Sequence, residues 1–152
     1  MSATGTDRVE FLCAFNKNQP LMAVGGAASG GEISRLMLSL EAIIASRMQL
    51  PSIIFDEIDT GVSGDVANRM GAMMLDMSAN LQVIAITHLP TVAAKGATHF
   101  KVFKYDDDDA THTSIRRLGP DERVAEIATM LSGDADSSEA RAAARSLISN
   151  KS

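Results

Sequence analysis

SIIFDE, residues 52–57, is a short apolar run that ends in two acidic residues. A continuous run of this length is typical of a strand that is buried on both faces of a parallel sheet. Residues 81–87, LQVIAIT, repeat the pattern and lead directly into His88. Two such runs with a helical stretch between them predict an α/β fold, in which a mainly parallel sheet is flanked by helices.

Two apolar stripes predict the helices that flank this sheet. The first precedes Pro51 and has helical spacing; it consists of Ile33, Leu36, Met37, Leu40 and Ile44. The second lies between the two strands and consists of Val66, Met70, Met73, Met74 and Met77. Methionine fills irregular gaps in cores, so we interpret this second stripe as core packing.

The ends of the chain show other patterns. Alternation over residues 9–15 predicts a half-buried strand, and alternation over 100–105 and 111–117 predicts an antiparallel β-hairpin. Helices are expected over 120–131, with Gly133 as the stop, and over roughly 137–148. The chain has no internal repeat and no long linker, so residues 1–152 are predicted to form one unit.

Composition excludes several classes of protein. The chain has 152 residues, of which 45% are hydrophobic, so disorder is excluded. Its net charge of -5 and lack of Trp are unlike a lone basic DNA-binding module or an aromatic stacking platform. A single cysteine, Cys13, and the absence of an apolar run of roughly 18–20 residues favour a reducing, cytoplasmic setting without a membrane.

The segment Ser29-Gly30-Gly31-Glu32 has two interpretations. It has the sequence of a capping box, with Ser at the cap and Glu three residues later, at the start of the first helix. It also suits a phosphate, because two glycines permit close approach and the helix N-terminus offers free N–H groups. The two interpretations compete for the hydroxyl of Ser29.

Acidic and imidazole side chains follow the two predicted strands. Asp56 and Glu57 come at the end of the first strand, and His88 follows the second. Strand ends are commonly polar, and a lone His there is usually a surface residue. Yet this is where open α/β sheets place ligands, and paired carboxylates there can hold magnesium and orient a water molecule. Asp59, just beyond, either forms a local turn or reaches across an interface.

The order of these features resembles that of ABC-type ATPases. The glycine-rich helix start, the strand ending in Asp-Glu, the following Asp and the strand ending in His resemble the signature motif, Walker B, D-loop and switch histidine. SGGEISR (29–35) is similar to the SMC-like branch of that superfamily. IIFDEIDTGVSG (53–64) and ITHLPTVAAKG (86–96) resemble the RecN family of bacterial DNA-repair proteins. TGTDRVEFLCAFN (4–16) and RVAEIATMLSG (123–133) extend the resemblance over nearly the whole chain.

The resemblance implies a role for each motif. The chain would be the C-terminal lobe of an ABC-type P-loop NTPase head that uses ATP and Mg²⁺. Asp56 would serve the magnesium ion, Glu57 would orient or activate the hydrolytic water, and His88 would contact the γ-phosphate. The nucleotide of a partner head would contact Ser29, Gly30, Gly31 and Glu32, and Asp59 would lie at the seam between the heads.

The chain departs from the family pattern in two respects. It contains no Gly-x4-Gly-Lys-Ser/Thr motif, which is Walker A, and no sustained heptads. The expected partners are therefore the N-terminal half of the same head, a second head joined by ATP, and DNA bound by the full-length protein in a bacterial nucleoid. Alone, the chain is expected to be inactive. The alternatives are another SMC-like ATPase and a non-catalytic interaction module.

Three further features are expected to be structural. The acidic run Asp106–Asp109 is interpreted as a solvated hairpin turn, with a cation site as the alternative. His99 and His112 lack partners at metal-ligand spacing. Four arginines are interpreted as solvated surface residues in an acidic chain; they are Arg116, Arg117, Arg141 and Arg145.

Overall fold

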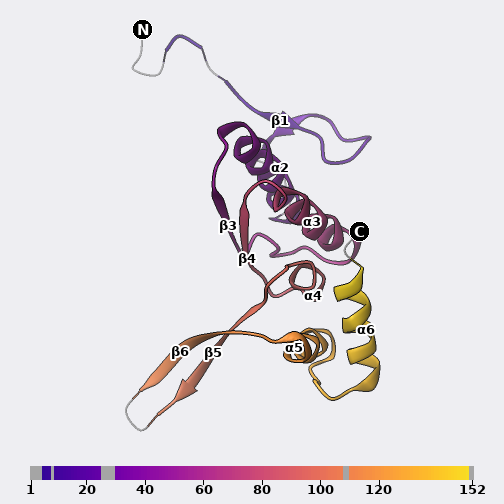
Figure 1. Ribbon diagram of the computed structural model, residues 1–152. Coiled ribbons are helices and arrows are strands. Elements are labelled where there is room, and N and C mark those ends of the chain that lie inside the picture. Colours follow the sequence, from indigo (N-terminus) through magenta and orange to yellow (C-terminus); the bar gives the residue numbers. More distant parts are fainter. Residues whose placement is uncertain (1–4, 8, 25–29, 108–109, 151–152) are drawn as a thin grey trace.

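The computed structural model of the chain describes residues 5–7, 9–24, 30–107 and 110–150. Figure 1 shows two helices packed side by side next to a pair of strands, with a hairpin and two further helices at the other end of the molecule. Helices and strands alternate along the middle of the chain, as the sequence predicts for an α/β fold.

The centre of the fold is a parallel pair of strands. Strand β3 (Ser52–Asp56) pairs with β4 (Gln82–Ile86), and Asp56 lies opposite Ile86 in the register. Helix α2 (Gly30–Met48) leads into β3, and helix α3 (Gly64–Met77) connects β3 with β4. Parallel strands require a crossover connection such as this helix, because the end of β3 and the start of β4 lie at opposite ends of the strand pair.

One face of this strand pair is packed against the two helices. Phe55 is 1% exposed and packs in a core with Leu38 of α2 and Met70 and Met74 of α3. The methionine stripe of α3 is therefore core packing, as predicted. The opposite face of the strands is open, since Ile54 is 64% exposed and Ile86 is 52% exposed. The expectation that both strands are buried on both faces is wrong for the described residues.

Helix α2 also differs from its prediction. Of the predicted stripe, Met37, Leu40 and Ile44 are each more than two-fifths exposed, whereas Leu38 and Ala45 are buried. The helix is apolar on two faces, and α3 packs against only one of them. Periodicity identified an apolar stripe but did not show which stripe has a partner.

The N-terminal strand is shorter than expected. Strand β1 (Leu12–Cys13) pairs antiparallel with β2 (Met22–Ala23), and each has two residues. Val9 and Phe11 are both 78% exposed, so residues 9–15 are not a half-buried strand. Only Cys13 and Phe15 of this stretch are partly buried, and its pairing with β2 covers only Leu12 and Cys13.

The C-terminal part has its own core. Helix α4 (Pro90–Ala93) follows β4, and the hairpin of β5 (Phe100–Asp106) and β6 (Thr111–Arg117) projects away from the helices, as Figure 1 shows. Helices α5 (Pro120–Ser132) and α6 (Ser138–Ser149) pack together around Ile127 and Ala144. The hairpin and both helices are confirmed, as is the left-handed stop at Gly133, whose φ is 78°.

Arg123 connects α5 with the segment that follows α4. Its Nη2 donates to the carbonyl oxygens of Ala94 and Gly96, both at 2.6 Å, so α5 is held to the end of α4.

The described strands form three separate pairs, one parallel and two antiparallel, so the expected mainly parallel sheet is present only as β3 and β4. Within the described residues, no helix is long and apolar enough to span a membrane.

Candidate functional site

The ends of β3 and β4 bring the predicted acidic residues and His88 to one edge of the strand pair. Because the strands are parallel and in register, Asp56 and Ile86 lie side by side. Glu57 follows the first, and Thr87 and His88 follow the second. Asp56, Glu57 and His88 are all exposed, so this edge presents two carboxylates and an imidazole to a ligand.

The backbone at Glu57 is held in an unusual conformation. Its φ is 50°, in the left-handed region that residues other than glycine rarely adopt. Its N–H donates to the carbonyl of Ile86 at 3.1 Å, and its carbonyl accepts from Oγ1 of Thr60 at 2.9 Å. Backbone strain of this kind persists only where surrounding bonds enforce it, and it is concentrated at functional sites. The observation supports a functional place for Glu57.

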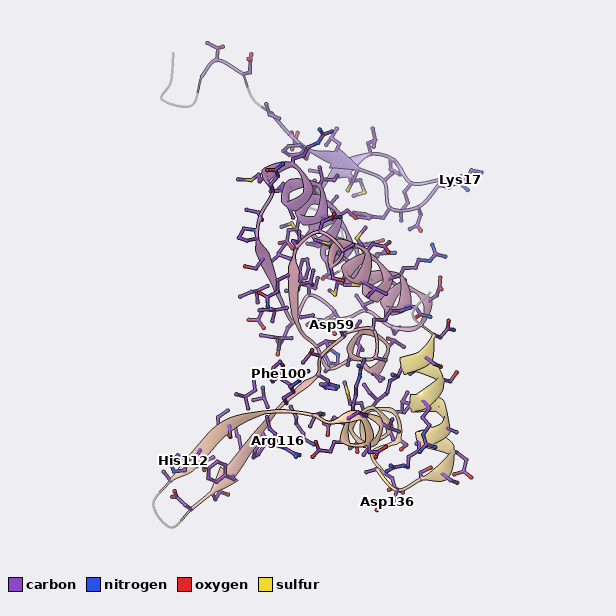
Figure 2. All side chains as sticks on the ribbon, in the orientation of Figure 1. Lys17, Asp59, Phe100, His112, Arg116 and Asp136 are labelled. Atoms are coloured by element: carbon purple, nitrogen blue, oxygen red, sulfur yellow. The ribbon has the colours of Figure 1, made fainter. Side chains whose placement is uncertain are left out.

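Asp59 is buried directly behind this edge. The residue is 1% exposed, and Figure 2 labels it near the centre of the molecule, where β4 leads into α4. Its Oδ2 accepts a hydrogen bond from Thr87 Oγ1, and its Oδ1 lies 3.5 Å from Nδ1 of His88. The carboxylate thus contacts Thr87 and faces His88 within this chain. The place of Asp59 at a seam between heads stays a prediction.

The loop after β3 contacts the start of α2. A Cβ built on Gly31 would lie 3.1 Å from the carbonyl oxygen of Gly61, so a larger residue at position 31 would press against the loop after β3. For Gly30, no atom of the described residues lies within 4 Å of such a Cβ. Ser29 lies outside the described residues, so the structure does not decide between its two interpretations.

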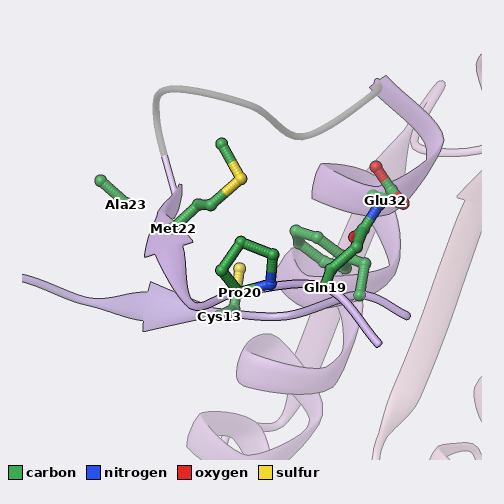
Figure 3. A pocket seen from close by; sticks show the side chains of 7 residues that line it. Cys13, Gln19, Pro20, Met22, Ala23 and Glu32 are labelled. Atoms are coloured by element: carbon green, nitrogen blue, oxygen red, sulfur yellow. The ribbon is translucent and has the colours of Figure 1, made fainter. Parts of the chain in front are cut away.

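Glu32 lines a small cavity at the other side of the α2 start. The cavity has a volume of about 50 Å³ and is formed mainly by the β1–β2 segment, as Figure 3 shows. A cavity of this volume holds only a few water molecules, so it is far too small for a nucleotide. The exposed edge of β3 and β4, rather than this cavity, is the candidate site.

The donor set at the edge fits one mode of metal binding. Among the residues that the structure describes, no group of three or more His, Cys, Asp or Glu side chains is placed to hold a metal ion. Magnesium, however, is usually held by one or two carboxylates together with substrate phosphates and water. Asp56, exposed at the strand end, fits as such a single ligand.

The remaining candidates have structural contacts. In the hairpin, Asp106 accepts from Thr111 Oγ1 at 2.6 Å, and Asp107 accepts from the N–H of Ala110 at 2.9 Å. His112 stacks on Tyr105. These contacts favour the hairpin-turn interpretation of the acidic run, of which residues 108–109 lie outside the described part.

Thr87 is a residue that the sequence analysis did not select. Its hydroxyl donates to Asp59 and accepts from the N–H of Leu89 at 3.0 Å, so it links the loop after β3 with the segment after β4. The available signal was its position between the second predicted strand and His88, where a hydroxyl has backbone and side-chain partners within reach.

Comparisons with known proteins give the relationship. No model of a protein family matches the chain. The chain is 44% identical over 133 residues to the DNA repair protein RecN of Bacillus subtilis. The aligned residues make up 88% of this chain and 23% of that protein. It is 42% identical to RecN of Xylella fastidiosa, over 95% of this chain and 26% of the other. Over almost all of its length, the chain is therefore similar to one part of the RecN proteins.

A third relative extends the match. RecN of Mycobacterium leprae is 41% identical over 146 residues, which covers 96% of this chain and 24% of that protein. The resemblance to RecN is therefore confirmed over almost the whole chain. The chain spans about a quarter of the length of these RecN relatives.

Proposed function

We propose that this chain is the C-terminal lobe of an ABC-type ATPase head in a RecN-type protein that acts in DNA double-strand break repair and recombination. The observation that carries the proposal is the edge of β3 and β4, where Asp56, Glu57 and His88 are exposed together in a sequence related to DNA repair proteins named RecN.

Each residue at the edge has a distinct proposed role. Asp56 holds the magnesium ion, together with phosphate oxygens and water. Glu57 orients or activates the attacking water, and His88 donates a hydrogen bond toward the γ-phosphate. When bound, Mg-ATP supplies the phosphoryl group and the metal charge that offsets the charge of its oxygens. The backbone conformation of Glu57 supports this assignment, because the hydrogen bonds that hold it fix the position of the Cα atom from which the side chain extends.

The start of α2 is proposed to meet the nucleotide of a second head. Ser29, Gly30, Gly31 and Glu32 would form this contact, with the loop that carries Asp59 beside them. Support comes from the contact between Gly31 and Gly61, which puts the two segments next to each other. ATP bound between two heads would then hold them together as a dimer.

The open face of the strand pair is proposed to be covered by the N-terminal half of the same head. Ile54, Ile84 and Ile86 are each more than two-fifths exposed there. Contiguous apolar surface of this kind marks an interaction site, and an uncovered strand edge favours further pairing. A partner that supplies strands and the phosphate-binding loop would cover the face and complete the ATP site.

We propose a cytoplasmic location at the nucleoid, where the full-length protein binds DNA.

The proposal is tested with a full-length RecN-type protein that carries this segment. Removing a hydrogen-bond donor to a transferring phosphoryl group typically costs about 10²-fold in rate. We expect His88→Ala to lower ATP turnover by about this factor, whereas His112→Ala in the hairpin should leave turnover unchanged. A wild-type protein without ATPase activity, or equal turnover in the two variants, would contradict the proposal.

A further inference from the structure

Asp59 has one satisfied and one unsatisfied carboxylate oxygen. Oδ2 accepts from Thr87, whereas Oδ1 is fully buried and has no hydrogen-bond partner among the described residues. A buried carboxylate oxygen without a partner is costly, because the water that it loses is not replaced. The side chain is 2% exposed, so solvent does not compensate.

The polar group facing Oδ1 is the imidazole of His88. Nδ1 lies 3.5 Å away, which is longer than the about 2.7–3.2 Å of a typical N–H···O hydrogen bond. The His88 side chain is 65% exposed, so a small rotation of the ring is not hindered by core packing. The rotation would bring Nδ1–H onto Oδ1 and give the buried oxygen its partner.

Thr87 sets the direction of this contact. Its hydroxyl group donates a hydrogen bond to Oδ2 of Asp59, and the same oxygen accepts a hydrogen bond from the N–H of Leu89 at 3.0 Å. The hydroxyl therefore fixes the carboxylate from one side and the start of α4 from the other. Oδ1 is left aimed at His88.

We propose that Asp59 is a positioning residue for His88, whose imidazole it orients with Nδ1–H toward the interior and Nε2 toward solvent. A carboxylate behind a histidine selects the tautomer and ring orientation in this way, because the two ring nitrogens are distinct. The orientation of the ring follows from the contacts of this chain alone. Its consequence for ATP hydrolysis rests on the proposed function.

The chain also contains a matched control. His112 contacts Asp107 through Nε2, at 2.7 Å, on the exposed hairpin. The His112 and Asp107 side chains are 44% and 50% exposed, so this carboxylate is solvated and does not depend on the imidazole. Asp107→Asn should therefore change the environment of His112 without an effect on His88.

The test is side-chain nitrogen NMR of histidine-labelled protein, at a pH well above the ordinary imidazole pKa of about 6.5. His88→Gln identifies the signals of His88. In the wild type we expect His88 to be protonated at Nδ1. In Asp59→Asn, the Thr87 hydroxyl should still donate its hydrogen bond to the side-chain oxygen, so the NH₂ group of the new Asn faces the His88 ring. Nδ1 must then accept a hydrogen bond rather than donate one. The signal of Nδ1-protonated His88 should therefore be lost. Asp59→Ala should also lose this preference.

The result that overturns the proposal is a His88 ring protonated at Nε2 in the wild type, or an identical His88 signal in the wild type, Asp59→Asn and Asp107→Asn. Kinetics give a second measurement in the full-length protein: Asp59→Asn should lower kcat about tenfold at unchanged KM, a size typical for loss of a supporting hydrogen bond. If the wild type does not hydrolyse ATP, the proposed function fails while the NMR result still decides the role of Asp59.

Discussion

The main-chain N–H of Glu57 donates a hydrogen bond to the carbonyl oxygen of Ile86, with an N···O distance of 3.1 Å. This bond extends the parallel pairing one residue beyond Asp56, the last residue of β3. Glu57 has a φ of 50° and lies next to the end of β4, after which Thr87 and His88 follow. The carboxylate proposed to act on water and the imidazole proposed to act on phosphate are therefore placed by the same pair of strands.

The strained backbone of Glu57 predicts an inverted order of stability for glycine and alanine. A left-handed residue other than glycine costs about 1–2 kcal/mol, whereas glycine elsewhere costs roughly 0.5–1 kcal/mol relative to alanine. Glu57→Gly should therefore be more stable than Glu57→Ala, by about 0.5–1 kcal/mol in urea unfolding. At Asp56, in regular strand, Gly should be less stable than Ala. Equal stabilities of the two variants at residue 57 would show that the backbone there is not strained.

The contact between Gly31 and Gly61 predicts a different effect at two adjacent glycines. A Cβ at residue 31 would meet a carbonyl oxygen at 3.1 Å, and overpacking typically costs about 1–3 kcal/mol. Gly31→Ala should lower the free energy of unfolding by about 1 kcal/mol even after the gain in helix propensity. Gly30→Ala, with open space, should be neutral or stabilising by up to about 1 kcal/mol. A stabilising Gly31→Ala variant would exclude the close approach of the loop to α2.

His99 predicts a pH dependence of stability. Burial lowers the pKa of His99 below its ordinary value of 6.5, and the positive charge of Arg123 lowers it further. Below pH 6.5 the unfolded chain binds a proton that the folded chain does not, so the free energy of unfolding should decrease as the pH falls from 6.5 to the lowered pKa. His99→Gln should remove this part of the decrease, whereas His112→Gln should keep it. An unchanged pH dependence in His99→Gln would contradict a buried neutral imidazole.

Part of the fold followed directly from the sequence. The runs at 52–56 and 82–86 are short, apolar and joined by a helix, a combination that few arrangements other than parallel strands satisfy. Since parallel strands end at the same edge, the proximity of Asp56 to the segment that carries His88 followed as well. The hairpin and the stop at Gly133 were predicted because turn residues and alternation are local signals.

Other features depend on partners that a sequence pattern does not reveal. The stripe of Met37, Leu40 and Ile44 has ideal helical spacing, yet Leu38 and Ala45 are the residues that pack. The bond between Thr87 and Asp59 joins residues 28 positions apart, and only the register of β3 and β4 brings them together. The inward direction of the Asp59 carboxylate could therefore not be predicted from spacing.

The central claim is that Glu57 acts on the water that attacks ATP, and the most direct test is Glu57→Gln in a full-length RecN-type protein that carries this segment. A positioned general base typically contributes about 10²–10⁴-fold in rate, and its loss lowers kcat rather than affinity. We expect turnover to fall by such a factor while Mg-ATP binding is retained and ATP-dependent dimers accumulate in sedimentation. Asp76→Asn, an exposed acid at the end of α3, should leave both turnover and assembly unchanged. Wild-type turnover in Glu57→Gln would contradict the account.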